Sequence, residues 1–507
     1  MTIDKNLGKR SAFSVLANVI RAAITFSTGV MIARWLGPES YGNMAFLLGV
    51  FVGVRQLLDM GSSAAFFTFL SQTKRSKYFV FLFFRWMLFQ FFAPLLVIAL
   101  FIPDEWVSKI WQNNERELVL LAFIAVYMQS NLWPLIVQLG ESQRRTLKVQ
   151  GLAVIIAIVN AVGVWILWGL DILNLYSLFA LLSVLYGLFS FLGHYGFEYS
   201  TSDQDGLDNF QANFSKYTKY CLPMIPYAWL SFAYIFLDRW LLQEFGGNLE
   251  QAFYGVGAQF AAVSLIATSA MLRVFWKEMA ESHERGDTEG SRILYVRMSR
   301  SLFFVGTAMS GFVIPWTSVI TEVALGDAYL GGTTTLMIMF LYPVHQSIGQ
   351  IGGAMLMATE HVVTQVYIGL VFMAVSMLVT YFVLAPASAY IPGLGAGSVG
   401  LAVKMVGMQF VQVNILGYII SRIWKWKFDW FYQFISLGGC MLVGLCAHQL
   451  SILFVGMDSV LLSVFVAGVI YAGCVLSGLW FMPWLLGLTT EELKKLGNTV
   501  LLKLRVN

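Results

Sequence analysis

Residues 33–42 read ARWLGPESYG and follow the first long apolar segment of the chain. Residues 238–244 read DRWLLQE, and the pair Tyr254-Gly255 follows them a little further on. The pattern Arg-Trp-Leu-x-x-Glu followed by Tyr-Gly therefore occurs twice, each time after an apolar segment. Short matches also arise by chance in a chain with 16 Trp, but the placement of these two favours an internal repeat.

The composition indicates an integral membrane protein. Of the 507 residues, 58% are hydrophobic and only 12% are charged, whereas soluble proteins carry about 25% charged residues. Such a chain has too few charged groups to cover a water-exposed surface. This excludes a disordered chain, a secreted disulfide scaffold and a nucleic-acid-binding module. The four cysteines lie apart in apolar stretches, so we expect neither a disulfide framework nor a metal site.

We expect about fourteen membrane-spanning helices, because each crossing needs about 20 predominantly apolar residues. An even number of spans places both termini on the same side of the membrane. Two basic residues, Arg297 and Arg300, blur one boundary and leave an alternative count open near 297–333. The expected spans are 11–33, 43–70, 79–102, 118–139, 150–170, 175–197, 220–243, 252–275, 297–318, 333–358, 363–385, 398–420, 432–454 and 460–484.

The distribution of basic residues orients these spans. Segments on the side of the N-terminus hold 21 of the 32 Lys and Arg, and segments on the opposite side hold three, namely Arg34, Lys109 and Arg116. Loops rich in Lys and Arg face the cytoplasm. We therefore expect a multi-pass membrane protein with both termini in the cytoplasm.

Six spans separate the two copies of the motif, so both copies have the same orientation. This predicts an all-α membrane protein with two six-helix lobes, related as parallel repeats, plus two C-terminal helices. Thr489 and Glu492 fit a capping box that starts an amphipathic tail. The expected parts are an N-terminal lobe at 1–197, a cytoplasmic linker at 198–219, a C-terminal lobe at 220–431, spans thirteen and fourteen at 432–484, and a cytoplasmic tail at 485–507.

The stretch at 33–42 closely resembles the signature of polysaccharide-exporting members of the multidrug/oligosaccharidyl-lipid/polysaccharide exporter superfamily, here the MOP superfamily. Residues 238–241 with Tyr254-Gly255 resemble its second-lobe counterpart, and the stretch Gly326-Asp327-Ala328-Tyr329 resembles a third shared element. The likeness covers the whole chain and is strongest to the O-antigen and exopolysaccharide repeat-unit flippases.

This resemblance implies transport of an undecaprenyl-pyrophosphate-linked glycan from the inner to the outer leaflet, for O-antigen, exopolysaccharide or capsule synthesis. The implied partners are that lipid-linked glycan, membrane lipid, and the polymerase and chain-length proteins of the same pathway. In the related lipid II flippases the last two helices form a groove for the polyprenyl tail. Uncharged spans thirteen and fourteen suit such a groove here, or else they are packing helices that face lipid.

Charged side chains within the spans are candidates for anion binding, because a charge at mid-membrane costs at least about 2.5 kcal/mol. Arg21 shares one helix face with Asn18 and Thr25, and this face is either a cavity wall or a surface packed on another helix. In the related lipid II flippases, arginines near the end of span one and in span two line the central cavity, which favours Arg34 and Arg55. The candidate pyrophosphate-binding residues are Arg21, Arg34, Arg55, Arg85 and Lys404.

Uncharged polar and aromatic side chains that recur on single helix faces suit the hydroxyls and ring faces of sugars. The alternative for each residue is hydrogen bonding between helices, which is common in membrane bundles. The candidate residues of a glycan cavity are Asn18, Thr25, Tyr127, Asn131, Tyr227, Ser231, Tyr234, Tyr342, Gln346 and Gln350.

Four residues are candidates for gating or ion coupling, namely Asp59, Asp238, Arg239 and His345. Asp59 follows Arg55 by four residues, so the two can form an ion pair, or Asp59 can take a proton. Adjacent helical residues point about 100° apart. We therefore expect Asp238 to share the polar face of span seven, and Arg239 to turn toward the other lobe or the headgroups as part of a gate.

Two other functions compete with the flippase. A multidrug antiporter of the same superfamily would favour an acidic cavity, whereas the deep charges here lean basic. A membrane-embedded polymerase or ligase usually carries a large external catalytic loop, which this chain lacks, so we expect a transporter and not an enzyme. No nucleotide-binding motif occurs and no cofactor is expected. Transport would draw on a proton or sodium gradient, or on consumption of the product outside.

The predicted topology can be tested with a reporter fused after Asn507. We expect activity only from a reporter that works in the cytoplasm, because 21 basic residues lie on the side of the termini and three lie opposite. A signal from a periplasm-specific reporter would show that the number of spans is odd.

Overall fold

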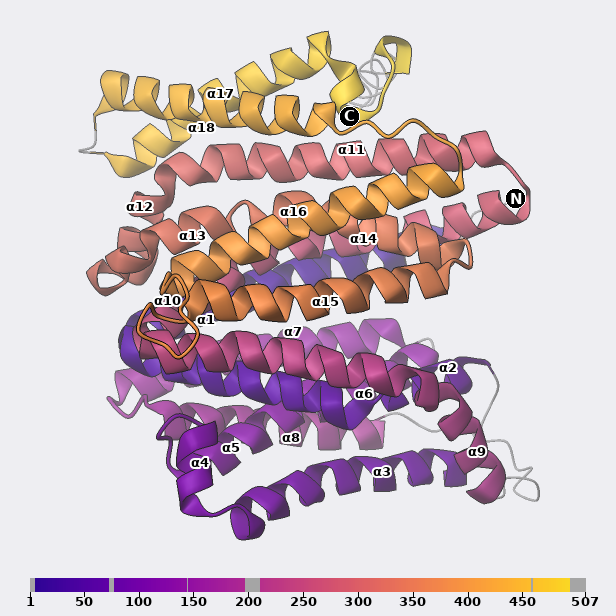
Figure 1. The fold of residues 1–507 in the computed structure, drawn as a ribbon, viewed down its shortest axis with the longest axis vertical. Coiled ribbons are helices and arrows are strands. Elements are labelled where there is room, and N and C mark those ends of the chain that lie inside the picture. Colours follow the sequence, from indigo (N-terminus) through magenta and orange to yellow (C-terminus); the bar gives the residue numbers. More distant parts are fainter. Residues whose placement is uncertain (1–4, 73–76, 144, 197–209, 457–458, 493–507) are drawn as a thin grey trace. The chain divides into compact units, whose positions relative to one another are not determined.

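The computed structural model describes residues 5–72, 77–143, 145–196, 210–456 and 459–492. Within these ranges the chain forms helices and no strand, which confirms the all-α class. The described helices are drawn as a ribbon in Figure 1. The chain divides into two compact units. Unit 1 comprises Met1–Gly255 with Met373–Leu401, and unit 2 comprises Val256–Phe372 with Ala402–Asn507. These bounds differ from those of the predicted lobes, so the two-lobe layout stays a prediction.

Unit 1 is built from helices that lie side by side, with α1 packed on α5 and α7, and α8 packed on α5 and α7. It also holds the first part of α10 and the second part of α15. The helices are α1 (Lys5–Asp59), α2 (Ser62–Gln72), α3 (Lys77–Leu96), α4 (Asp104–Ile110), α5 (Arg116–Tyr127), α6 (Trp133–Ser142), α7 (Thr146–Gly169), α8 (Leu175–Gly196), α9 (Phe210–Cys221), α10 (Ile225–Glu284) and α15 (Val362–Leu384).

Unit 2 is arranged around α11, which packs against α14 on one side and α17 on another, and α17 packs on α18. Its interior is apolar, with Phe275, Leu302 and Ile351 in one buried cluster. Its helices are α11 (Thr288–Val313), α12 (Thr317–Ile320), α13 (Thr333–Met339), α14 (Tyr342–Ala358), α16 (Gly397–Ile423), α17 (Phe431–Val455) and α18 (Val460–Phe481), with the remaining parts of α10 and α15.

Eleven helices of the described chain are long and apolar enough to cross a membrane, against the fourteen spans expected. Two of them, Leu16–Asp59 and Phe214–Val263, have 44 and 50 residues. A crossing needs about 20, so each is long enough for two. The predicted span 333–358 is broken at Phe340-Leu341 into α13 and α14. The number fourteen therefore stays a prediction.

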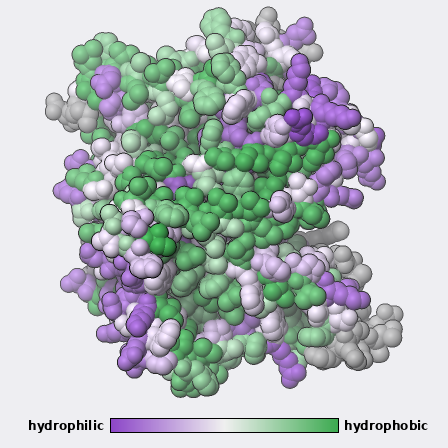
Figure 2. Space-filling view, viewed as in Figure 1, coloured by the Kyte–Doolittle hydropathy of each residue, from purple (hydrophilic) through white to green (hydrophobic). Residues whose placement is uncertain are grey.

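The outer surface of these helices requires lipid. The most apolar window of α18 has a mean hydropathy of 2.3, yet only 17% of it is buried within the protein. Large side chains such as Leu461 and Phe465 are among the most exposed of the chain. Figure 2 shows apolar side chains along the middle of the helices on the viewed face, and polar side chains gathered toward the helix ends. The chain is therefore a multi-pass membrane protein.

Both long helices of the repeated motif bend at a glycine. Gly37 in α1 has φ 72° and ψ 165°, and Gly247 in α10 has φ 70° and ψ −168°. This backbone region is essentially restricted to glycine. Pro38 follows Gly37 directly, and the fixed φ of proline suits the first position of the helix that resumes there.

The two copies of the motif touch each other within unit 1. A Cβ on Gly42 would lie 1.8 Å from the backbone oxygen of Asn248, and a Cβ on Gly255 would lie 3.0 Å from Cβ of Ala45 and 3.4 Å from Tyr41. The Tyr-Gly pair of each copy therefore packs against the other copy. Both tyrosines, Tyr41 and Tyr254, are buried.

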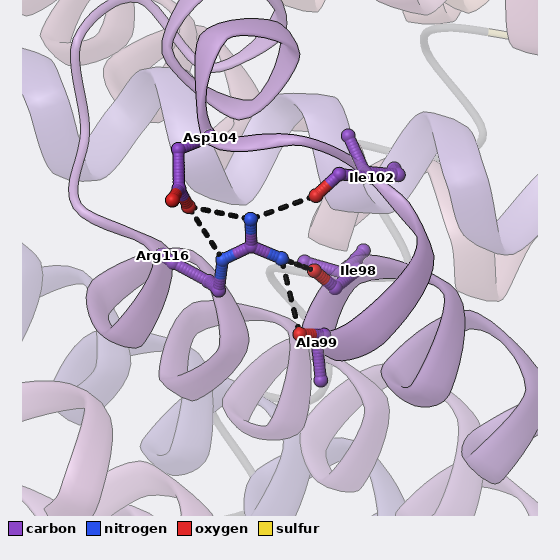
Figure 3. Close-up of polar contacts among 5 residues, drawn as sticks. All are labelled: Ile98, Ala99, Ile102, Asp104 and Arg116. Atoms are coloured by element: carbon purple, nitrogen blue, oxygen red, sulfur yellow. Dashed lines mark hydrogen bonds and ion pairs between the residues drawn. The ribbon is translucent and has the colours of Figure 1, made fainter.

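Arg116 satisfies backbone carbonyls in and just after the π-helical segment Val97–Phe101, which follows α3 (Figure 3). Its guanidinium donates to the carbonyl oxygens of Ile98, Ala99 and Ile102. It also forms an ion pair with Asp104, with 2.5 Å between Nη2 and Oδ1. Carbonyls at a helix end need such donors, so this basic residue has a structural role.

The expected capping box is confirmed. The backbone N–H of Thr489 donates to Glu492 Oε2 at 2.9 Å, and the N–H of Glu492 donates back to Thr489 Oγ1 at 3.3 Å. The first of these bonds, with smaller contributions from the Thr489 hydroxyl and Arg297, holds the pKa of Glu492 below its usual value. The rest of the predicted tail, 493–507, and the linker residues 198–209 lie outside the described residues.

The two bends can be tested by substituting the glycines with alanine. Gly37→Ala and Gly247→Ala should each destabilise the protein by about 1–3 kcal/mol, because a Cβ strains this backbone conformation. Gly151→Ala is the matched control, since Gly151 is helical and also has open space around its Cα. Apparent melting temperatures of the purified proteins in detergent give the comparison. Equal behaviour of all three variants would contradict the backbone argument.

Candidate functional site

Arg21 belongs to a group of polar residues in unit 1. Its Nη2 donates to Oδ1 of Asn18 at 3.4 Å, and both Arg21 and Thr25 are exposed on α1. The guanidinium also interacts electrostatically with Tyr186 of α8, whose hydroxyl accepts from Gln129 Nε2 at 3.3 Å. The structure thus adds two polar residues from other helices to the predicted face of α1.

Gln129 lies in a π-helical segment, Met128–Leu132, which joins α5 to α6. Asn131, a predicted glycan-cavity residue, lies in the same segment and is buried. Single π-helical turns inside helices occur often at functional sites. Gln129 and Tyr186 were not among the predicted site residues, but the run Gln129-Ser130-Asn131 within an apolar span was a visible signal.

Asp59 does not pair with Arg55 in the structure. Its Oδ1 accepts hydrogen bonds from the Ser62 hydroxyl at 3.2 Å and from the backbone N–H of Ser63 at 3.0 Å, and so caps the start of α2. The carboxylate is already occupied by this cap, which explains why the possible i, i+4 ion pair with Arg55 does not form. Arg55 is half-buried and Arg34 is exposed.

Arg85 lies beside an apolar pocket of unit 1. Its guanidinium carbon is 4.8 Å from the ring centre of Phe81, and Phe81 lines a pocket of about 660 Å³ together with Phe84, Ile136 and Phe191. Arg85 itself is exposed. A cation at the edge of an apolar pocket offers one place for an anionic group and one for a hydrocarbon chain.

The predicted glycan-cavity residues of unit 1 have different surroundings. Tyr127 is buried and donates its hydroxyl hydrogen to the carbonyl oxygen of Met87 at 2.6 Å, as expected for a contact between helices. Tyr227 is exposed, and Ser231 and Tyr234 are half-buried along the same helix. The hydroxyl of Tyr127 is thus engaged inside unit 1, and a cavity lined by the other three stays a prediction.

Asp238 and Arg239 contact different parts of unit 1. Asp238 is buried, and its Oδ1 lies 2.6 Å from the hydroxyl of Thr380 on α15. Arg239 lies with its guanidinium carbon 4.9 Å from the ring centre of Tyr254, and its side chain packs against Gly49. The predicted divergence of these neighbours is therefore present, and the gate remains a hypothesis.

The predicted residues of unit 2 gather around α14. His345 is buried between the rings of Phe303 and Phe410, with centroid distances of 5.5 and 5.0 Å. Its Nδ1 has no hydrogen-bond partner in the part of the chain that the structure describes. Lys404 of α16 is buried, and Tyr342, Gln346 and Gln350 are half-buried.

No model of a protein family matches the sequence, and no curated protein matches it. Solved structures nevertheless share its fold. The lipid II flippase MurJ in an inward closed conformation aligns with a TM-score of 0.65 and 13% identity, over 92% of this chain and 98% of that chain. A multidrug resistance MATE family transporter of the MOP superfamily, in an inward-facing conformation, aligns with a TM-score of 0.53 and 13% identity, over 81% and 96%. The chain therefore shares its fold with these two transporters.

The contact between Asp238 and Thr380 can be tested by Thr380→Val. The change removes the hydroxyl beside a buried carboxylate, and hydrogen bonds to charged groups contribute about 1.5–3 kcal/mol. Thr28→Val is the matched control, because the buried Thr28 hydroxyl, like that of Thr380, bonds the carbonyl four residues earlier but is not seen to contact a carboxylate. We expect a clear fall in apparent melting temperature for Thr380→Val only. Equal losses would contradict a special role of the carboxylate contact.

Proposed function

We propose that the protein is a flippase that moves undecaprenyl-pyrophosphate-linked oligosaccharide repeat units across the bacterial inner membrane by alternating access. The substrate combines an anionic pyrophosphate, a polar glycan and a long apolar tail. Each part needs a different environment, and the chain offers a candidate for each. The polymerase and chain-length proteins of the same pathway would act on the product.

The observation that carries this proposal is the set of polar residues around Arg21, which lies on the apolar helix α1. A guanidinium is always charged and binds phosphate oxygens through paired donors. Here it donates to Asn18 and interacts electrostatically with Tyr186, whose hydroxyl accepts from Gln129. A buried ion pair would explain a membrane arginine without any ligand, but among the described residues Arg21 forms no ion pair with a carboxylate. An anion is the ligand that this arrangement favours.

The extent of the structural likeness supports a flippase over a drug transporter. The alignment with the lipid II flippase covers 92% of this chain and the alignment with the MATE transporter covers 81%. The difference amounts to about 55 residues, enough for two more spans. Helices α17 and α18 are two apolar helices of this kind, and they suit a groove for the polyprenyl tail. The apolar pocket beside Arg85 offers a second surface for hydrocarbon.

The geometry at Asp238 is compatible with proton coupling. The hydroxyl of Thr380 lies 2.6 Å from Asp238 Oδ1 and 2.8 Å from the carbonyl oxygen of Ser376. One hydroxyl proton cannot serve both acceptors. With Asp238 ionised, Thr380 donates to the carboxylate. With Asp238 protonated, the acid donates to Thr380, and Thr380 donates to Ser376. Both protonation states therefore keep a hydrogen bond at this position.

A multidrug antiporter is the second candidate, and the MATE likeness favours it. Organic cations need carboxylates in the cavity. The two carboxylates predicted for gating or ion coupling are both engaged within the protein, since Asp59 caps α2 and Asp238 contacts Thr380 inside unit 1. Resistance to ethidium in cells that express the protein separates the two candidates, because a flippase should confer none.

The anion-binding role can be tested with alanine variants of Arg21, Arg34 and Arg55. We expect each change to abolish polymer export while the protein still inserts, because the pyrophosphate loses a charged partner. Lysine variants should restore export in part, since the charge survives but the paired donors do not. Polymer at the cell surface is measured beside the amount of protein in the membrane.

Arg422→Ala is the matched control for these variants. Arg422 is an exposed arginine near the end of α16 that stacks on Tyr418, and its loss should leave export unchanged. Normal export by all three alanine variants would show that the anion-site hypothesis is wrong.

A further inference from the structure

A second pocket lies in unit 2, at the polar ends of α11, α16 and α17, and it includes none of the transport-site candidates. Its volume is about 230 Å³. The loop 424–430 between α16 and α17 covers it, because the ring of Phe428 packs over Gly417, where a Cβ would lie 2.8 Å from Phe428 Cε2. Tyr295 and Trp426 also line it, with ring centres 6.1 Å apart.

The charges that line this pocket are mostly positive. They are Arg292, Arg300 and Lys427, with Asp429 as the one carboxylate among the lining residues. Arg300 is fixed in place, since Nη2 lies 2.6 Å from Asp429 Oδ2, Nη1 donates to the carbonyl oxygen of Trp484 at 2.9 Å, and the ring of Tyr432 lies beneath the guanidinium. Asp429 is therefore neutralised by Arg300.

Lys427 is the remaining cation of the pocket once the ion pairs of Arg300 and Arg292 are taken into account. It is exposed, and it forms no ion pair within 4.0 Å in the described part of the chain, whereas Arg292 pairs with Glu289. The net charge at the pocket is therefore positive, and its source is a lysine on the covering loop.

A buried hydroxyl at the pocket also makes no well-formed hydrogen bond among the described residues. Ser299 is only 4% exposed and lines the pocket. Its Oγ lies close enough to Tyr295 to interact with it, but it makes no hydrogen bond of ordinary geometry among the described residues. Buried polar groups are nearly always hydrogen-bonded in native proteins. A ligand oxygen in the pocket would satisfy this one.

The size and position of the pocket indicate which class of ligand it can hold. Pockets for drug-sized molecules span roughly 300–1,000 Å³, so this one is too small for an oligosaccharide and large enough for a phosphate-sized headgroup. It lies where the uncharged, outward-facing helix α17 begins, so a lipid chain can continue along that helix. The first turn of α17 also adds the positive end of a helix dipole.

We infer that this pocket binds a phosphate group, supplied by the headgroup of an anionic membrane lipid and held by Lys427 and the Ser299 hydroxyl. The same chemistry would accept a free pyrophosphate from solution. The site does not depend on the proposed transport function, because it is detected by binding and not by export.

The test measures lipid binding to the purified full-length protein by native mass spectrometry. Dioleoylphosphatidylglycerol is titrated in parallel with dioleoylphosphatidylcholine, and inorganic pyrophosphate is titrated by calorimetry into protein in neutral-lipid nanodiscs. Lys427→Gln should weaken phosphatidylglycerol binding about fivefold, the effect of losing one basic residue near a charged membrane surface. Lys425→Gln is the matched control, because Lys425 is exposed in the same loop but does not line the pocket.

Ser299→Ala provides an independent variant. Removing a hydroxyl that makes no well-formed hydrogen bond among the described residues should leave the melting temperature unchanged or raise it, while phosphate binding falls about threefold, as expected for one hydrogen bond. Losses for phosphatidylglycerol in Lys427→Gln and Ser299→Ala but not in Lys425→Gln support the lipid site. The same losses for pyrophosphate with none for the lipid support the phosphate chemistry and overturn the lipid source. Equal losses in Lys425→Gln and Lys427→Gln overturn the pocket.

Discussion

The contact between the two copies of the repeated motif is the constraint on which unit 1 depends. At Gly42 the backbone of α1 approaches Asn248 so closely that no side chain fits, and at Gly255 the backbone of α10 approaches Tyr41 and Ala45. This approach is available only because α1 and α10 bend at Gly37 and Gly247, one before each Tyr-Gly pair. Two long helices are thereby locked together at equivalent positions, and α5 and α7 pack on α1.

Polar groups inside an apolar protein divide into those that hold the fold and those that remain available. Arg116 satisfies carbonyls of the π-helical segment that follows α3, and Asp59 caps α2. These contacts offset the cost of placing charge among apolar helices. Arg21 and Lys427 have no ion pair with a carboxylate in the described structure. The lack of such an ion pair, and not charge alone, distinguishes these candidate binding residues from the structural ones.

The candidate site could be predicted only in part from sequence. The polar face of Asn18, Arg21 and Thr25 followed from helical spacing, because that spacing is local. Its partners Gln129 and Tyr186 come from other helices and meet it only through packing. The cationic pocket of unit 2 combines residues 292–300 with residues 417–433. Nothing in the local pattern of either segment indicates the other.

The sequence by itself determined the membrane class, the helical content, the position of the repeated motif and the capping box at Thr489. Each of these depends on composition or on spacing within a few residues, where hydrophobicity and helical geometry act directly. Only the tertiary structure decided that α1 and α10 each continue through a bend, that Asp59 caps α2 in place of pairing with Arg55, and that Asp238 meets Thr380. These outcomes depend on which segments come within hydrogen-bond distance. That is set by the packing of whole helices, and no local pattern encodes it.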